Sequence, residues 1–507
     1  MPSATTADAF RSLVDHARET ALLKSTMGLL QWDEETYLPP AGGPYRAEQL
    51  AYLAGLVHRR ETDPQVGDWL AAAADTPEAA DPHSATGAVV HGMQRDYAKR
   101  TKLPQALVEE LTRTSSLGQQ AWKEARREDN FATFLPMLEK TIDLKRQEAA
   151  AYGYDASPYD ALLDDYEPGE TAANVARVLG GLREQLTPLV EKIAASGRRP
   201  GLKLAGRHYP RAAQEAFGKR AAAAIGFDFD AGRLDVTAHP FCGGAGPRDI
   251  RLTTRYDEDD FAGGLFSILH EAGHGMYEQG LEAESFGLPT GEAVSLGIHE
   301  SQSRMWENLV GRSRAFWRHF LPPLVEAFPE ALAGADAEAF YFAINESRPS
   351  LIRTESDEAT YNLHIAIRFE LEQALLAGDL PVADLPAAWD EKYDRYLGIR
   401  PPSAADGVLQ DVHWGAGLVG YFPTYALGNL YASQFFAQAT HELSDLDEQF
   451  ARGEFQTLHA WLRKNIHQHG RAYSAPQLVQ RVTGEPLSHG PLIAHLTAKY
   501  GELYGFS

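Results

Sequence analysis

The sequence has a single cysteine, Cys242, among its 507 residues, so no disulfide can form within the chain. A chain of this kind suits a reducing compartment, and we expect a cytoplasmic location. Long hydrophobic runs are also missing. No stretch approaches the roughly 18 consecutive apolar residues that span a bilayer, and the first twenty residues lack the apolar core of a signal peptide.

Basic residues are outnumbered, with 47 Lys and Arg against 70 Asp and Glu, which gives a formal net charge of −23. Nucleic acids and anionic membrane surfaces both require a basic face on the protein that binds them. We therefore expect neither a nucleic-acid partner nor a membrane partner. Hydrophobic residues make up 44% of the chain, which is enough for a large buried core.

Apolar residues recur at three- and four-residue spacing along most of the chain, which predicts a mainly α-helical protein. No linker divides the chain, so residues 1–507 are predicted to form one large helical unit, folded as two lobes around a cleft. The segment 249–256 alternates and is rich in Thr and Ile, which predicts a short strand or hairpin. The clearest helices are predicted at 102–127, 134–152, 170–196, 210–225, 260–279, 335–346, 354–376 and 424–442.

The clearest chemical signal is His-Glu-Ala-Gly-His at residues 270–274. On a helix from 260 to 279, His270 and His274 project from the same side, a spacing that suits two imidazole ligands on one tetrahedral Zn²⁺. Glu271 is turned about a third of the way round the helix, so it can act as general base on a metal-activated water without binding the metal. Two histidines on an exposed helix face are the alternative, but the apolar neighbours predict a buried helix.

The predicted helix has recognisable ends. Asp259 or Asp260 can cap its N-terminus, and Gly280 stands where a helix often ends.

Zinc needs a third protein ligand, whose position distinguishes the classes of metallopeptidase. Gly280 stands where a metzincin would place its third histidine, which excludes that class. Glu300 lies 26 residues after His274, and Glu307 follows Glu300 by seven residues on the same face of an expected helix. Glu300 as ligand with Glu307 supporting the site is a sensible geometry, although an ordinary surface charge is the alternative for Glu307. The other downstream carboxylates are Glu278, Glu282, Glu284 and Glu292.

Five motifs, in order, resemble those of the carboxypeptidase Taq family of metallocarboxypeptidases. Their sequences in this chain are DIRLT (249–253), HEAGH (270–274), HESQ (299–302), IRTESD (352–357) and GVLQDVHW (407–414). Segments 32–36, 158–169 and 420–429 also resemble sequences of this family, so the resemblance covers nearly the whole chain. Two positions depart from the family pattern: Ser356 replaces an Ala, and Cys242 stands where a hydroxyl residue is expected.

The resemblance implies a mainly α, two-lobed fold around a deep substrate groove, with a small β-sheet beside the metal helix. Thimet oligopeptidase and angiotensin-converting enzyme have a similar fold. It further implies removal of single residues from peptides with a free C-terminus, one Zn²⁺ or Co²⁺ ion per chain, and a cytoplasmic homodimer. Two His and a carboxylate would also accept Mn²⁺.

A donor beyond the metal is needed for the oxyanion that forms during attack. His413 is our candidate, with the alternative of a packed histidine bonded to Asp411 or to backbone. Asp411 would then support the site residues without contacting the metal or the substrate. Tyr421 and Tyr425 share one helix side and follow His413 by 8 and 12 residues, and related helical metallopeptidases place a Tyr at similar spacing. Either tyrosine can be the donor, and either can instead be a core aromatic.

An enzyme that acts at C-termini must bind a free carboxylate, and Arg353 is the predicted partner because its planar guanidinium forms paired hydrogen bonds. Asp357 is expected to hold Arg353 from one helical turn away, with an ordinary ion pair as the alternative. Arg251 and Thr253, on the expected strand, are weaker candidates for contact with substrate backbone. A structural role for these two is equally plausible.

Other functions remain open at this point. An oligopeptidase or a dipeptidyl carboxypeptidase would use the same chemistry, and a helical binding scaffold without catalysis belongs to a different class. His299 and His364 are expected to be packing residues.

Overall fold

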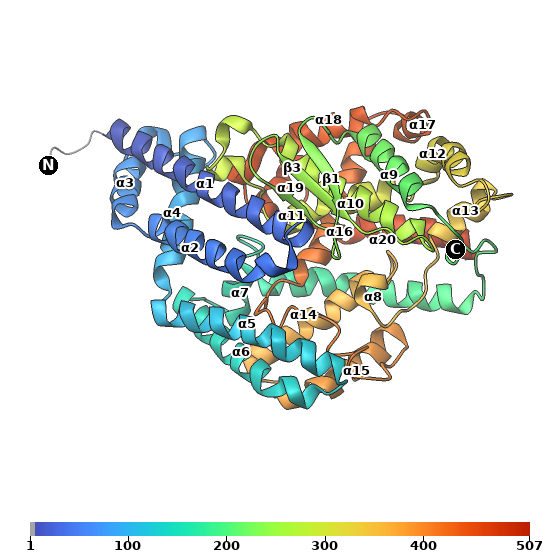
Figure 1. Ribbon diagram of the computed structural model, residues 1–507, viewed down its shortest axis with the longest axis horizontal. Coiled ribbons are helices and arrows are strands. Elements are labelled where there is room, and N and C mark those ends of the chain that lie inside the picture. Colours follow the sequence, from blue (N-terminus) through green and yellow to red (C-terminus); the bar gives the residue numbers. More distant parts are fainter. Residues whose placement is uncertain (1–5, 507) are drawn as a thin grey trace.

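The computed structural model describes residues 6–506 of the chain. Helices make up most of this range, as predicted, and the strands form one small sheet (Figure 1). The helices before the sheet are α1 (Thr6–Thr36), α2 (Gly43–Glu61), α3 (Pro64–Ala74), α4 (Ala85–Lys102), α5 (Gln105–Arg127), α6 (Phe131–Tyr152), α7 (Pro158–Leu163), α8 (Ala172–Ala195) and α9 (Arg211–Ile225).

The sheet has three strands in the order β1-β3-β2. Strand β1 (Gly232–Val236) runs parallel to β3 (Ile250–Thr254), and β2 (Cys242–Gly244) pairs antiparallel with the other edge of β3. Strand β3 confirms the strand predicted at 249–256. It packs against the helix that follows it, because Gly275 of that helix has no side chain to collide with Leu252 of β3.

The chain returns to helices after the sheet, beginning with α10, which carries the HEAGH motif. These helices are α10 (Phe261–Gly280), α11 (Leu296–Arg304), α12 (Arg314–Ala327), α13 (Ala337–Ile344), α14 (Tyr361–Ala377), α15 (Leu385–Leu397), α16 (Pro423–Glu442), α17 (Leu446–Ala451), α18 (Gln456–Asn465), α19 (Ala475–Thr483) and α20 (Gly490–Tyr504). A turn of π-helix, η5 (Met305–Val310), continues α11 directly.

Seven of the eight helices predicted from the sequence match the structure to within three residues at each end. The prediction at 354–376 is wrong at its start, because α14 begins only at Tyr361. The side chain of Asp357 accepts hydrogen bonds from the backbone N–H groups of Ala359 and Thr360. Asp favours such turns over a helix interior, since its carboxylate competes for backbone donors. Residues Arg353–Glu355 form a separate short 3₁₀ turn, η6.

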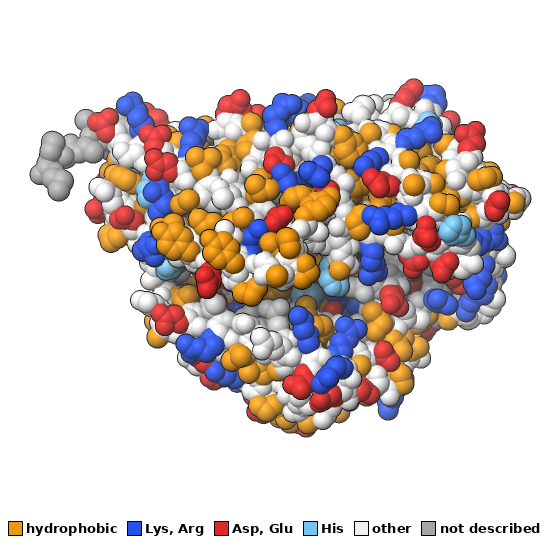
Figure 2. All heavy atoms as spheres, in the orientation of Figure 1, with side chains coloured by type: hydrophobic (Ala, Val, Ile, Leu, Met, Phe, Trp, Pro, Cys, Tyr) orange, Lys and Arg blue, Asp and Glu red, His pale blue; other side chains and the backbone are white. Residues whose placement is uncertain are grey.

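Figure 1 shows α5, α6, α14 and α15 gathered on one side of the molecule, while the sheet and α10, α11 and α16 lie on the other. One large hydrophobic core runs from Ala125 to Tyr504 and joins both sides, whereas α1, α3 and α4 pack around two smaller clusters. Figure 2 shows a hollow between the two sides, with histidine side chains visible in it. None of the helices in residues 6–506 combines the length and the apolar composition needed to cross a membrane.

Candidate metal centre and active site

The metal helix α10 is fixed at both ends. Asp260 caps its N-terminus by accepting a hydrogen bond from the backbone N–H of Ala262 at 3.0 Å, as predicted. Gly280 is the last residue of the helix, and a Cβ there would collide with His467. The helix also approaches α11 closely, since a Cβ on Gly273 would lie 2.6 Å from the backbone oxygen of Gln302. This contact brings the HEAGH and HESQ motifs together.

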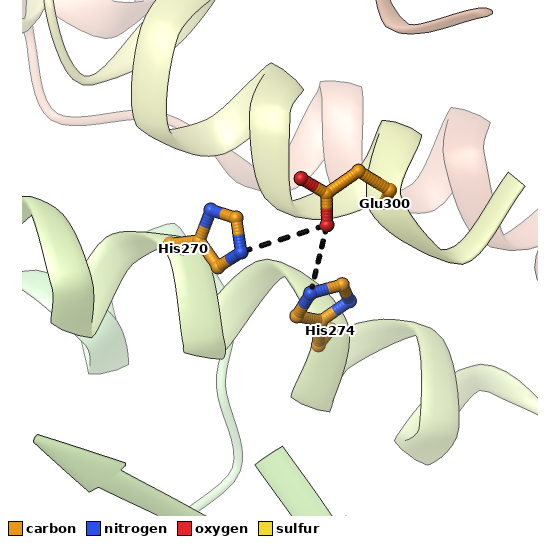
Figure 3. A group of neighbouring side chains, drawn as sticks. All are labelled: His270, His274 and Glu300. Atoms are coloured by element: carbon orange, nitrogen blue, oxygen red, sulfur yellow. Dashed lines mark ion pairs between the residues drawn. The ribbon is translucent and has the colours of Figure 1, made fainter. Parts of the chain in front are cut away.

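Two histidines of α10 and one glutamate of α11 converge on a single point (Figure 3). Glu300 Oε2 lies 3.4 Å from His274 Nε2 and 3.7 Å from His270 Nε2. Ligand bonds of about 2.0–2.1 Å in tetrahedral geometry separate ligand atoms by about 3.3–3.4 Å. The spacing and the N, N, O donor set therefore fit a divalent cation such as Zn²⁺ or Co²⁺. Among residues 6–506 this is the only His, Cys, Asp and Glu group of such geometry.

Arg304 controls which oxygen of Glu300 is available. Its Nε donates to Glu300 Oε1 at 2.7 Å, leaving Oε2 toward the two histidines. The guanidinium also lies 4.5 Å from the ring centre of Tyr361. Burial opposes ionisation of Glu300, but Arg304 and the two histidines outweigh it and hold the pKa of that carboxyl well below its usual range. Glu300 is therefore a carboxylate at neutral pH.

The Nδ1 atoms of the two histidines have different partners. His270 Nδ1 donates to Glu307 Oε2 at 2.9 Å, the position expected of a supporting carboxylate. The turn of π-helix after α11 carries Glu307, and such turns occur often at functional sites. His274 Nδ1 instead lies 2.5 Å from Nδ1 of His299. His299 in turn reaches Glu278 through Nε2, at 2.7 Å.

Glu271 lies beside the converging ligands and is only 6% exposed. Burial raises the pKa of its carboxyl to about 7, opposed by His270 and reinforced by the charge of Glu300. A carboxyl with a pKa near the operating pH is well matched to accepting and returning a proton.

Arg353 is buried, and its partner differs from the prediction. Its guanidinium pairs with Asp411 at 3.0 Å, through both Nε and Nη2, and its Nη1 donates to the hydroxyl of Tyr361 at 2.9 Å. Arg368 contacts the other oxygen of Asp411, at 2.6 Å. Two guanidinium groups thus share one carboxylate, which leaves a net positive charge in this cluster.

Asp357 does not hold Arg353, contrary to the sequence prediction. The i,i+4 geometry that the prediction assumed is lost because these residues are not in an α-helix. The Asp357 carboxylate instead accepts hydrogen bonds from the Ser347 hydroxyl at 2.7 Å and from the Arg348 backbone at 3.0 Å.

His413 is close to both predicted tyrosines. Its Nε2 lies 3.2 Å from the hydroxyl of Tyr425, and the ring centre of Tyr421 is 5.4 Å from that of His413. Asp411 Oδ1 is 3.9 Å from His413 Nδ1, too far for a hydrogen bond. Burial lowers the pKa of His413 to about 4 despite that carboxylate. The His413 imidazole is therefore neutral at pH 7. The guanidinium of Arg353 lies nearby, 4.9 Å from the ring centre of Tyr425.

The two strand residues proposed to contact substrate backbone have structural partners. Thr253 is completely buried, and its hydroxyl bonds both the N–H and the C=O of Phe241, at 2.8 and 2.9 Å. These contacts match the structural role that the sequence left open for Thr253. Arg251 is held by the carboxylate of Asp249 and lies 4.2 Å from the ring centre of Trp32.

A family model for carboxypeptidase Taq (M32) metallopeptidases matches residues 12–500. The chain belongs to this family. Thermostable carboxypeptidase 1 of Thermus thermophilus is 47% identical over 98% of this chain and 99% of its own length. Carboxypeptidase 1 of Bacillus subtilis is 36% identical over 97% and 98%, respectively. The crystal structure of an M32 carboxypeptidase from Deinococcus radiodurans R1 superimposes with a TM-score of 0.95 at 43% identity, covering 98% of this chain and 99% of that one.

These comparisons confirm the predicted family and the mainly α fold, and the protein is a metallocarboxypeptidase, a peptide hydrolase. Sequence reasoning did not find the contacts that His299, Arg304 and Arg368 make at the site. The Glu300–Arg304 pair has the favourable order for an i,i+4 ion pair, a signal that could have found Arg304. The other two contacts join distant segments, and nothing in the local sequence indicates them.

Proposed function

We propose that this M32 carboxypeptidase releases single amino acids from peptides with a free C-terminus, using His270, His274 and Glu300 to hold one divalent metal ion. The observation that carries the proposal is the convergence of two Nε2 atoms and one carboxylate oxygen beside the buried Glu271. Zn²⁺ is the favoured ion, with Co²⁺ as the second choice. When bound, the ion would polarise the scissile carbonyl and lower the pKa of the attacking water.

Each remaining residue has a task that follows from its surroundings. Glu271 accepts the proton of the attacking water and later delivers it to the leaving amine nitrogen, a transfer suited by its raised pKa. His413 and one of Tyr421 and Tyr425 donate hydrogen bonds to the oxyanion. Arg353 binds the C-terminal carboxylate of the substrate, because the carboxylate of Asp411 is shared with Arg368 and leaves positive charge uncompensated.

The family resemblance also supports a cytoplasmic homodimer. Light scattering of the purified protein measures the oligomeric state, with about twice the monomer mass expected and monomer mass contradicting the dimer.

A blocked dipeptide tests the reaction and Glu271 together. The wild type should release its C-terminal residue, and a chelator should abolish this. Glu271→Gln should lower kcat by about 10²–10⁴, the usual contribution of general acid–base catalysis. The variant should keep its metal, because Glu271 is not a proposed ligand. Cleavage that survives in Glu271→Gln at more than a tenth of the wild-type rate would contradict the assigned role.

A further inference from the structure

We propose that His299 and Glu278 act as positioning residues that fix the tautomer and the orientation of the metal ligand His274, an inference that rests on the proposed metal site. The contacts form one line: His274 Nδ1 lies 2.5 Å from His299 Nδ1, and His299 Nε2 lies 2.7 Å from Glu278 Oε1. We call these three residues the relay.

The proton positions in the relay follow from the site. His274 Nε2 faces the converging ligands, so it must present a lone pair and the ring proton must sit on Nδ1. His299 Nδ1 must then accept that proton's hydrogen bond, so the proton of His299 is on Nε2. This second N–H donates to the carboxylate of Glu278, which accepts only. One carboxylate thus determines both tautomers.

The two rings approach each other through their Nδ1 atoms, as the relay requires. Their planes differ by 25° and their centres are 4.4 Å apart. Face-to-face stacking would separate the ring atoms by more than 3 Å, whereas the two Nδ1 atoms are 2.5 Å apart. The ring of Tyr277 packs against His299 with centres 5.4 Å apart and limits its movement.

The two histidine ligands are therefore supported in different ways. His270 donates directly to the carboxylate of Glu307, whereas His274 reaches a carboxylate only through a second imidazole. Glu278 is one turn beyond His274 on α10, and His299 directly precedes the ligand Glu300 on α11. The relay thereby links the helix of two ligands to the helix of the third.

Packing alone is the competing explanation for His299, and two substitutions separate the explanations. Asn places its side-chain oxygen near the position of His Nδ1 and keeps an acceptor for His274. Leu fills a similar volume and has no acceptor. Glu278→Gln removes the charge at the end of the relay, and Glu282→Gln is the matched control, because Glu282 lines the same surface pocket as Glu278 and is outside the relay.

The experiment measures Co²⁺ affinity of metal-free protein by competition with a chelator, together with the visible spectrum of the Co²⁺ form. His299→Leu should weaken affinity by about 10–100-fold, the usual effect of removing a group that supports a ligand. His299→Asn should recover most of that loss, and Glu278→Gln should lie between wild type and Leu. Glu282→Gln should match wild type in affinity and spectrum. Thermal unfolding of the metal-free variants checks that each is folded.

Equal Co²⁺ affinity in His299→Leu and wild type would overturn the relay. Equal losses in the Leu and Asn variants would also overturn it, because packing and not an acceptor would then be responsible. Wild type that binds no Co²⁺ would contradict the metal site of the proposed function, and the relay with it. Wild type that binds Co²⁺ but cleaves no peptide would overturn the proposed function, while the affinity series would still decide the relay.

Discussion

At the scale of single residues, the two oxygens of Glu300 have different partners. One oxygen is held by Arg304, and the other faces His270 and His274. Two charges of opposite sign buried together are stable only when each remains paired. Arg304 therefore both orients the Glu300 carboxylate and keeps it ionised.

Replacing Arg353 with Lys should impair recognition of the substrate C-terminus. Lys keeps one positive charge but loses the planar fork that binds a carboxylate through two hydrogen bonds. Losing a hydrogen bond to a charged group costs about 1.5–3 kcal/mol, so kcat/KM should fall about 10–150-fold. The measurement is kcat/KM for a peptide with a free C-terminus.

The control for Arg353 is the same peptide with an amidated C-terminus. Wild type should lose activity on the amide, and Arg353→Lys should lose little more, because the group that the arginine recognises is already gone. Additive losses from the two changes would mean that Arg353 does not contact the carboxylate.

Residues near the motifs were predictable from sequence, whereas their partners were not. Spacing on one predicted helix indicated His270 and His274 as ligands, whereas Glu300 was one of several downstream carboxylates until its motif was compared with the family. Arg353 was found from its motif, but its partner Asp411 is 58 residues away, and the nearer Asp357 was chosen in error. His299 stands directly beside a proposed ligand, yet its contact with His274 depends on how closely α10 and α11 approach.

At the scale of elements, small residues set the distances between the helices that carry the site. Gly273 lets α10 approach α11, and Gly428 of α16 lies against Glu300, where any larger residue would displace the glutamate side chain. Helix α14 is joined to the loop that carries His413 in another way. Glu372 of α14 accepts hydrogen bonds from the hydroxyl of Tyr159, the indole of Trp414 and the backbone of Gly420.

Glu372 should make stability depend on pH. Burial raises its pKa to about 7, above the value of about 4.5 in an unfolded chain, despite the three donors. Between about pH 4.5 and 7 the Glu372 carboxyl is therefore protonated in the folded protein but ionised in the unfolded chain. The free energy of unfolding should fall as pH rises through this range. At about 1.36 kcal/mol per pKa unit, the loss is on the order of 3 kcal/mol.

Glu372→Gln should remove this component. The check is the difference in free energy of unfolding between wild type and the variant, measured from pH 4.5 to 8 in the same buffers. The free energy of unfolding of wild type, minus that of Glu372→Gln, should fall as pH rises. A difference that stays constant would show that Glu372 does not titrate in this range.

At the scale of the whole molecule, metal binding should stabilise the fold, because three ligands from two helices come together only when the chain is folded. Metal at about 1,000 times its dissociation constant adds about 4 kcal/mol to the free energy of unfolding. Removing the metal should therefore lower the unfolding temperature of wild type and of Glu271→Gln. Glu300→Gln should show a much smaller shift. Equal shifts in Glu300→Gln and wild type would place the metal elsewhere.

The overall architecture was more predictable than the site. Helices with strong apolar periodicity matched closely, and the mainly α fold followed from them. The exception at 354–376 arose where the Asp357 carboxylate competes for backbone donors, a choice that depends on distant contacts such as that of Asp357 with Ser347. The organisation of the chain as a single two-lobed unit stays a prediction.

The most direct test of the account is a time course of peptide products followed by mass spectrometry. Metal-depleted protein is supplied with one equivalent of Zn²⁺ or Co²⁺ and given a peptide of about ten residues with a free C-terminus. The account predicts a ladder of products that lose one C-terminal residue at a time and no ladder before metal is added. Internal fragments or dipeptides as the first products would contradict it.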